Sequence, residues 1–459
     1  MENRNPATSE IISTIPRSSN IDVQSAVEAA QRAFPEWAVS SYDERAEWLE
    51  KIADALEEKS EEIARLESMD TGKPISLARA VDATRSVSNF RFFAEQVRNL
   101  EQQNFEMDDA SNHVLMNPVG VAGLITPWNL PLYLLSWKIA PAIAMGNTVV
   151  AKPSELTPMT ADLLAKTLVE VGLPQGVVNI IHGYGTEVGQ AIVEHPQVRL
   201  VSFTGGTQTG RIVAETASRM FKKLSLELGG KNSSIIFADA DLEEAIPGVA
   251  RAGFLNQGQV CLCGSRILVE RSIHDDFLAR FSQYVSEMKL GNPSNESTQL
   301  GSLISNEHRE KVESYIQIAK DEGAVLSTGG ERPSLGEPFD SGAFLRPTVI
   351  SGVSIDSRCS TEEIFGPVVV VHPFDSEEEA VTIANGTEYG LAGSVWTKDL
   401  EKGQRVAEAI DSGMIWVNCW LHRDLRVPFG GTKNSGLGRE GGKWSLSFFS
   451  EVQNICIKR

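Results

Sequence analysis

The stretch GFLNQGQVCLCGSR, residues 253–266, places a cysteine directly behind small and amide-bearing residues. Glycines in this stretch permit a tight turn that brings a sulfur atom close to a ligand. A thiol at such a turn can point into a cleft together with its own N–H, which suits a nucleophile whose product is an oxyanion. Cys261 is therefore a candidate catalytic nucleophile. Taken alone, a single cysteine is more often buried and inert, so the other residues of the chain must decide.

A carboxylate in unusual surroundings is the second candidate. Glu227, in LSLELGGK, ends an apolar strand and precedes two glycines. Glutamate is rarely placed in such surroundings for structure alone. Desolvation there would raise its pKa towards neutrality and make it a usable general base. The alternative is an interdomain ion pair, with Lys231 as the candidate partner.

The third candidate is an amide held in a rigid turn. Asn129 lies in TPWNLP, residues 126–131, between two prolines. Its side-chain N–H can stabilise the oxygen that becomes negative when a thiolate adds to a carbonyl. One such donor accelerates a reaction by about 100-fold or more. A turn-capping asparagine is the alternative.

A nucleotide-binding pattern is present, although no G-x-G-x-x-G follows a strand. VSFTGGT, residues 201–207, leaves a strand and enters a helix, and such a helix N-terminus can seat a diphosphate. By itself this signal is weak. Lys152 and Glu155, in AKPSE, end another strand and offer an ammonium and a carboxylate to ribose hydroxyls. A carboxylate there would repel the extra phosphate of NADP, which favours NAD.

Composition limits the remaining possibilities. A chain of 459 residues is long enough for two or three domains. A net charge of −19 argues against nucleic-acid or anionic-membrane partners, but not against a small anion bound by a few arginines. Five scattered cysteines fit a reducing compartment, and seven histidines show no metal-ligand spacing, so we expect no metal.

No basic and apolar leader opens the chain, so we expect no signal peptide. The most apolar region, residues 119–151, is interrupted by prolines, asparagines and Lys138, and cannot form one membrane span. These features predict a soluble, cytoplasmic protein.

Hydrophobic periodicity predicts helices over residues 42–69 and 75–98, with Arg85 of the second helix facing the core. From residue 114 onward, short apolar strands alternate with helices, which is typical of a doubly wound α/β fold with parallel sheets. A second α/β series begins after Gly229. We therefore place the domain junction at residues 228–230.

Together these motifs resemble the aldehyde dehydrogenase superfamily. The matching segments are PWNLP, KPSE, FTGG, LELGGKN, GQVC, EEIFGPV and PFGGTKNSGLGREGG. The resemblance implies an NAD-binding domain (residues 1–100 and 119–229), a catalytic domain (230–432), and a small β oligomerisation element (101–118 and 446–459). It also implies a homodimer or homotetramer.

The same resemblance implies roles for individual residues. Cys261 corresponds to the nucleophile, Glu227 to the base, and Asn129 with the Cys261 N–H to the oxyanion hole. Lys152 and Glu155 correspond to residues that bind the adenine ribose. Glu363 and Phe365 correspond to residues at the nicotinamide ribose and ring. The full set of expected cofactor positions is Thr126, Trp128, Lys152, Glu155, Gly205, Gly206, Gly229, Glu363 and Phe365.

Two departures from the family pattern are visible. The chain begins near ENRNPATSE, so we expect the N-terminal β-strands usual in the family to be missing. Where the family commonly has FTGS, Gly206 removes a hydroxyl that could touch phosphate, so we expect a lower cofactor affinity.

Within the family, the resemblance is strongest to 2-aminomuconate and 2-hydroxymuconate semialdehyde dehydrogenases, through residues 83–95, VCLCGSR and NCWLHRDLRVPFGG. It implies that Arg85 and Arg423 bind substrate. Inward-facing arginines are costly unless an anion meets them. A salt bridge from Arg423 to Asp424 is the alternative, and Arg426 is a possible substitute. We expect Cys263 to be a packing residue or the partner of Cys261 in a disulfide of the resting protein.

The expected reaction is oxidation of a carboxylate-bearing semialdehyde to an acid by NAD, through a cysteine thiohemiacetal and thioester. The thiolate would be favoured by nearby helix ends and by the cationic nicotinamide. An apolar aldehyde of the retinal or apocarotenal type, or a simple semialdehyde, is the alternative substrate. A catalytically inactive structural relative and a redox-sensing pair of Cys261 and Cys263 are alternatives of other classes, although one-residue spacing strains an intramolecular disulfide.

Overall fold

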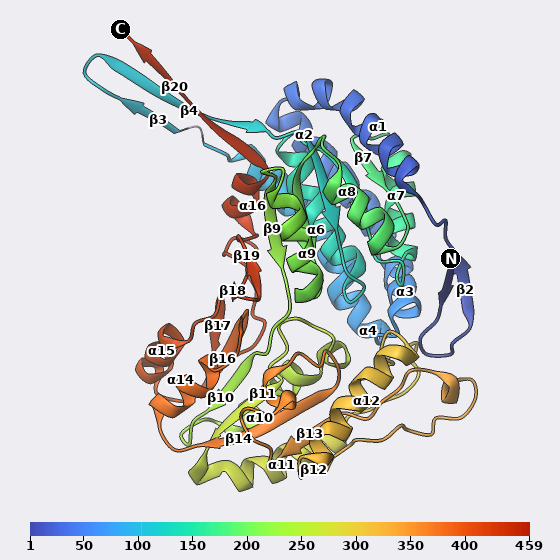
Figure 1. The fold of residues 1–459 in the computed structure, drawn as a ribbon, viewed down its shortest axis with the longest axis vertical. Coiled ribbons are helices and arrows are strands. Elements are labelled where there is room, and N and C mark those ends of the chain that lie inside the picture. Colours follow the sequence, from blue (N-terminus) through green and yellow to red (C-terminus); the bar gives the residue numbers. More distant parts are fainter. Residues whose placement is uncertain (102) are drawn as a thin grey trace.

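The computed structural model describes residues 1–101 and 103–459, and three main sheets organise them (Figure 1). The six-stranded sheet has the order β19-β9-β8-β5-β6-β7. Its five longer strands run parallel, and β19 pairs antiparallel with β9. The bounds are β5 Val121–Ile125, β6 Thr148–Lys152, β7 Val178–Ile180, β8 Val198–Thr204, β9 Lys223–Glu227 and β19 Gly436–Leu437. The predicted parallel α/β arrangement is confirmed.

Helices surround this sheet on both faces (Figure 1). They are α1 Asn20–Val39, α2 Tyr42–Glu58, α3 Ser60–Thr71, α4 Ile75–Ala78, α5 Thr84–Arg98, α6 Pro131–Ala144, α7 Met159–Glu170, α8 Gln190–Glu194 and α9 Thr207–Ser218. The prediction of one helix over 42–69 was wrong, because Lys59 leaves the helical region at φ −99° and ψ 10°. The helix predicted over 75–98 contains a π-helical turn at Arg79–Ala83, a feature frequent at functional sites.

The seven-stranded sheet has the order β12-β13-β14-β11-β10-β16-β17 and is parallel except for β12. Its strands are β10 Ser233–Ile236, β11 Arg266–Glu270, β12 Val325–Thr328, β13 Thr348–Ser351, β14 Val368–Phe374, β16 Ala392–Trp396 and β17 Met414–Val417. Its helices are α10 Leu242–Phe254, α11 His274–Ser286, α12 Asn306–Asp321, α13 Arg358–Thr361, α14 Glu377–Asn385 and α15 Leu400–Ala409. The two large sheets lie within the ranges predicted for the two domains, apart from β19.

A three-stranded antiparallel arm projects from the body of the molecule (Figure 1). It contains β3 Gln103–Glu106, β4 Ala110–Pro118 and β20 Ser450–Lys458, and α16 Gly442–Phe448 leads into it. Smaller pairs join β15 Tyr389–Gly390 to β18 Thr432–Lys433, and β1 Glu2–Arg4 to β2 Ile11–Thr14. Residues 2–14 therefore form a β-hairpin. No helix among the described residues is long and apolar enough to cross a membrane.

Candidate active site

A cavity of about 530 Å³ lies where the carboxyl ends of β5, β8 and β9 approach α10 and the turn before Cys261. Parallel sheets bind ligands at this edge, because loops from several strand ends converge there. Eleven of the predicted site residues line it: Arg85, Trp128, Asn129, Gly205, Gly206, Glu227, Gly229, Cys261, Glu363, Phe365 and Arg423. Thr126, Lys152 and Glu155 are not part of its lining.

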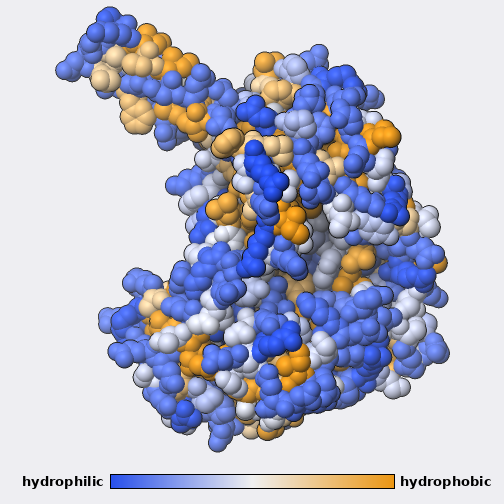
Figure 2. Space-filling model, in the orientation of Figure 1, coloured by the Kyte–Doolittle hydropathy of each residue, from blue (hydrophilic) through white to orange (hydrophobic). Residues whose placement is uncertain are grey.

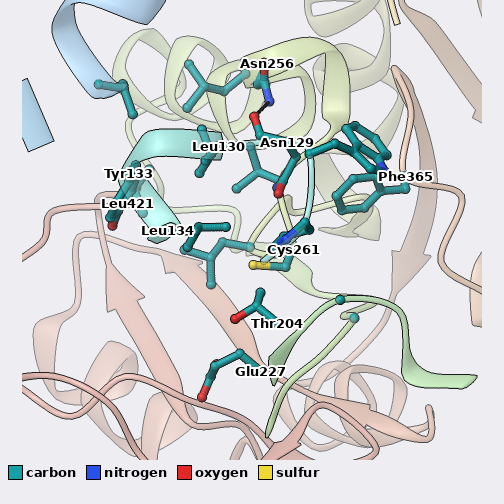
Figure 3. A pocket seen from close by; sticks show the side chains of 18 of the residues that line it. Asn129, Leu130, Tyr133, Leu134, Thr204, Glu227, Asn256, Cys261, Phe365 and Leu421 are labelled. Carbon is teal, nitrogen blue, oxygen red and sulfur yellow. Dashed lines mark hydrogen bonds between the residues drawn. The ribbon is translucent and has the colours of Figure 1, made fainter. Parts of the chain in front are cut away.

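The three predicted catalytic side chains converge. Figure 3 shows the Cys261 sulfur between the Asn129 amide and Glu227. The Asn129 side chain is buried, and its Nδ2 donates to the Gln259 carbonyl at 3.0 Å. Asn256 Nδ2 donates to the Asn129 carbonyl at 3.1 Å. One hydrogen of Asn129 Nδ2 is thus committed to the cysteine turn, and the second is free for a substrate oxygen.

The turn before Cys261 is built from left-handed backbone. Asn256, Gln257 and Gly258 have φ of 54°, 57° and 72°. A Cβ on Gly258 would lie 2.0 Å from the Gly366 carbonyl oxygen, so only glycine fits this approach. The predicted glycine-dependent turn is therefore present, and it fixes the direction in which the Cys261 side chain points.

The surroundings of the Cys261 thiol favour its protonated form. Burial raises its pKa well above the ordinary value, and the negative charges of Glu227 and Glu363 raise it further. The expectation that nearby helix ends and the cationic nicotinamide favour the thiolate stays a prediction. A positive charge brought by a ligand must lower this pKa before the sulfur can react.

Glu227 has the electrostatics of a general base. Burial raises the pKa of its carboxyl, the neighbouring Glu440 raises it further, and Lys138 opposes the effect. Both carboxyl oxygens lack a hydrogen-bond partner among the described residues. The raised pKa predicted from the sequence is confirmed. The alternative ion pair is not formed, since the Lys231 Nζ is likewise without a partner in the described part of the chain.

A buried ion pair beside Glu227 was missed by sequence reasoning. Lys138 Nζ donates to Glu440 Oε1 at 2.7 Å and to Ser202 Oγ at 2.7 Å, and Trp137 Nε1 donates to Glu440 Oε2 at 2.8 Å. A buried lysine needs such partners. The signal available was Lys138 itself, a charged residue within the apolar stretch 119–151.

The residues predicted for the nicotinamide side form a close-fitting wall. Glu363 Oε1 accepts a hydrogen bond from the Gly230 N–H at 2.9 Å, and a Cβ on Gly229 would lie 2.3 Å from Glu363 Oε2. Phe365 has a left-handed φ of 60°, and His308 Nε2 donates to its carbonyl at 2.7 Å. Burial lowers the pKa of His308 to about 4, so its ring is neutral, and Lys311 is the cation that lines the cavity beside it.

The predicted diphosphate and ribose positions fit a dinucleotide. Gly206 is the N-cap residue of α9, and a Cβ there would meet open space, so the first-turn N–H groups face an uncrowded region. Lys152 Nζ donates to Glu155 Oε2 at 3.0 Å, next to Thr126, whose N–H donates to the Lys152 carbonyl. Contact of these residues with a ribose stays a prediction, as does the effect of Gly206 on affinity.

Two arginines, Arg85 and Arg423, line the cavity without carboxylate partners among the described residues. Arg85 lies over the Tyr133 ring at 5.5 Å, and its buried Nη2 has no hydrogen-bond partner. Arg423 lies 4.0 Å from the Phe429 ring centroid, and its buried Nε also lacks a partner. The proposed Arg423–Asp424 salt bridge was wrong.

Asp424 pairs instead with Arg426, whose Nε lies 3.0 Å from both Asp424 oxygens. Arg426 is exposed and does not line the cavity, so it is not a substitute for Arg423.

Cys261 and Cys263 are free thiols, and Cys263 is buried. Burial raises the pKa of the Cys263 thiol to about 12. We therefore interpret Cys263 as a packing residue.

Comparison with known proteins agrees with this geometry. The aldehyde dehydrogenase family model matches residues 1–455. The 2-aminomuconic semialdehyde dehydrogenase of Mus musculus is 50% identical over 462 residues, covering 100% of this chain and 95% of that protein. The 2-hydroxymuconic semialdehyde dehydrogenase of Pseudomonas sp. (strain CF600) is 45% identical over 464 residues, covering 100% and 96%. A solved betaine aldehyde dehydrogenase from Staphylococcus aureus in complex with NAD+ has a TM-score of 0.97 at 42% identity, covering 99% of this chain and 91% of that one. The chain belongs to the aldehyde dehydrogenase family.

Proposed function

We propose that the protein oxidises an aldehyde with a distal carboxylate, such as 2-aminomuconate or 2-hydroxymuconate semialdehyde, to the diacid with NAD. The observation that carries the substrate class is the pair of guanidinium groups, Arg85 and Arg423, whose buried nitrogens lack partners in the cavity of Cys261. A carboxylate supplies the missing hydrogen bonds, each worth about 1.5–3 kcal/mol when a charge is involved. The relatives from mouse and Pseudomonas, named as muconic semialdehyde dehydrogenases, support the same class.

NAD, when bound, supplies the acceptor for the hydride that leaves the substrate carbon. In this proposal Lys152 and Glu155 hold its adenine ribose, the α9 N-terminus its diphosphate, and Glu363 with Phe365 its nicotinamide half. The close approach of Glu363 to Gly229 sets the shape of the site.

The chain's own residues carry the remaining steps. The Cys261 thiol gives its proton to solvent water, and the thiolate then adds to the aldehyde carbon, while Asn129 Nδ2 and the Cys261 N–H bind the resulting alkoxide. Once the thiohemiacetal is oxidised to a thioester, Glu227 removes a proton from water and the water oxygen attacks the acyl carbon. Sulfur then leaves as the acid forms. The buried Lys138–Glu440 pair next to Glu227 offers groups to which this proton can pass.

Part of the cavity wall is apolar. Tyr133, Leu134, Leu262 and Leu421 line it, and Figure 3 shows Leu134 close to the Cys261 sulfur. Such a wall suits the unsaturated carbon chain that separates the aldehyde from the carboxylate in these substrates.

Replacing either arginine is expected to separate charged from uncharged substrates. Arg85→Ala and Arg423→Ala should each raise the KM for 2-hydroxymuconate semialdehyde by about 10–100-fold, because each removes a charge-assisted hydrogen bond. The KM for hexanal, which has no carboxylate, should change by less than about threefold. Steady-state kinetics with both aldehydes measures the difference.

Equal losses on the two aldehydes would contradict the carboxylate clamp and favour a neutral or apolar aldehyde. Arg426→Ala is the matched control, because Arg426 lies three residues from Arg423 but pairs with Asp424 outside the cavity. An absence of activity on every aldehyde would instead support an inactive relative of the family.

We also propose that the β3–β4–β20 arm joins subunits into a homodimer or homotetramer in the cytoplasm. Figure 2 shows apolar side chains along the projecting arm, and Phe105, Met107, Val452, Ile455 and Ile457 are all exposed there. A partner that covers them would remove this apolar surface from water. The five cysteines are free, which fits a reducing compartment. Light scattering should give a mass of at least twice 50.0 kDa, and a monomer would contradict the arm's role.

A further inference from the structure

We propose that Arg251 is a third substrate-recognition residue, which draws the anionic aldehyde into the cavity before Arg85 and Arg423 bind its carboxylate. This inference rests on the proposed substrate class and deepens it. Arg251 lies in the last turn of α10 and lines the cavity, but its side chain is exposed, unlike those of the other two arginines. It therefore stands where a substrate arrives from solvent.

The position of the Arg251 guanidinium is tied to the nucleophile. Its Cζ lies 5.6 Å from the Trp420 ring centroid, and its Nη1 donates to the Trp420 carbonyl at 3.3 Å. Trp420 is buried, and its Nε1 donates to the carbonyl of Leu262, the residue after Cys261, at 3.1 Å. The guanidinium held on Trp420 lines the same cavity as the reactive sulfur.

The guanidinium is also left without a counter-ion. No carboxylate among the described residues lies within ion-pair distance of Arg251, whereas Arg280 of the adjacent helix pairs with Glu243 of α10. The bond to the Trp420 carbonyl is a long one and uses a single N–H. Most of the donors of Arg251 are therefore available to an incoming anion.

A cation at the entrance of the cavity would attract an anionic substrate through long-range electrostatics. The chain has a net charge of −19. An anionic substrate must therefore approach against the field of the whole protein, although Arg85, Arg423 and Lys311 line the same cavity. At about 0.1 M salt, charges act over roughly 10 Å, so local cations at the entrance decide the attraction.

A purely structural role makes different predictions. A cation in the last turn of a helix interacts favourably with the helix dipole and stabilises the helix. Removing such a residue would lower the thermal stability and affect all aldehydes alike. Substrate attraction instead affects charged aldehydes only and weakens as salt is added.

The test compares Arg251→Ala, Arg251→Lys and the unmodified full-length protein on 2-hydroxymuconate semialdehyde and hexanal at 20 mM and 500 mM NaCl. For Arg251→Ala we expect kcat/KM on the anionic aldehyde to fall about 5–10-fold at low salt, because KM rises. At high salt the fall should be less than about twofold. Arg251→Lys keeps the charge and should retain at least about half of kcat/KM. Hexanal kinetics should not change.

Arg199→Ala is the matched control, because Arg199 is exposed, makes no described ion pair and lies outside the cavity lining, so the variant changes net charge equally. An equal fall for hexanal, an effect independent of salt, or the same fall in Arg199→Ala would each overturn the role of Arg251. Failure of the unmodified protein to oxidise the anionic aldehyde would instead overturn the proposed function, and this outcome is seen before any variant is made.

Discussion

Cys261→Ala is expected to abolish aldehyde oxidation, with kcat falling by about 10⁴-fold or more. Without the sulfur no thiohemiacetal forms, and neither Asn129 nor Glu227 has an intermediate to act on. The Cys261 side chain lies between these two groups, so the loss removes the centre of the site rather than its support (Figure 3). The absorbance of reduced NAD, followed with saturating aldehyde, measures turnover.

Cys263→Ala is the matched control for this variant. Cys263 is buried two residues away, its Sγ lies 4.0 Å from the Leu255 carbonyl, and it does not line the cavity. We expect its removal to reduce kcat by less than about threefold while slightly lowering thermal stability. Equal inactivation by both substitutions would point to the thiol pair instead, and full activity of Cys261→Ala would exclude it as the nucleophile.

Much of this site could be predicted from the sequence because its residues follow the ends of parallel strands. Asn129 comes after β5, Gly205 after β8, and Glu227 ends β9, so the sheet itself brings them to one edge. Helical spacing similarly indicated that Arg85 faces inward. In each case a local pattern was enough, since the topology of the fold supplied the long-range placement.

Other features depend on contacts that no local pattern encodes. Lys138 and Glu440 are 302 residues apart, so their ion pair exists only once both are buried beside Glu227. Adjacency favoured a salt bridge from Arg423 to Asp424, but packing against Phe429 turns the Arg423 guanidinium into the cavity. The protonation state of the Cys261 thiol likewise follows from burial and from charges contributed by distant segments.

Glu227→Gln should separate the two halves of the reaction. The substitution keeps shape and removes the base, so the first turnover should still give a burst of reduced NAD, while steady-state kcat falls about 10²–10⁴-fold as the thioester accumulates. Stopped-flow measurement of the burst and mass spectrometry of the acylated protein report this directly. Loss of the burst together with kcat would contradict a role confined to hydrolysis and place Glu227 in the activation of Cys261.

The pH dependence of Glu227→Gln provides a second and independent readout. Burial and the charge of Glu440 raise the pKa of the Glu227 carboxyl, so the base form accumulates only as pH rises through that raised value. Steady-state kcat of the unmodified protein should therefore increase with pH, and the rise should be absent in Glu227→Gln, which has no carboxyl to ionise. Glu363→Gln is a useful contrast: its carboxyl oxygen accepts the Gly230 N–H, so this change should weaken NAD binding and leave the rise in place. A rise that persists in Glu227→Gln would show that another group, with the Cys261 thiol as the leading candidate, controls the pH profile.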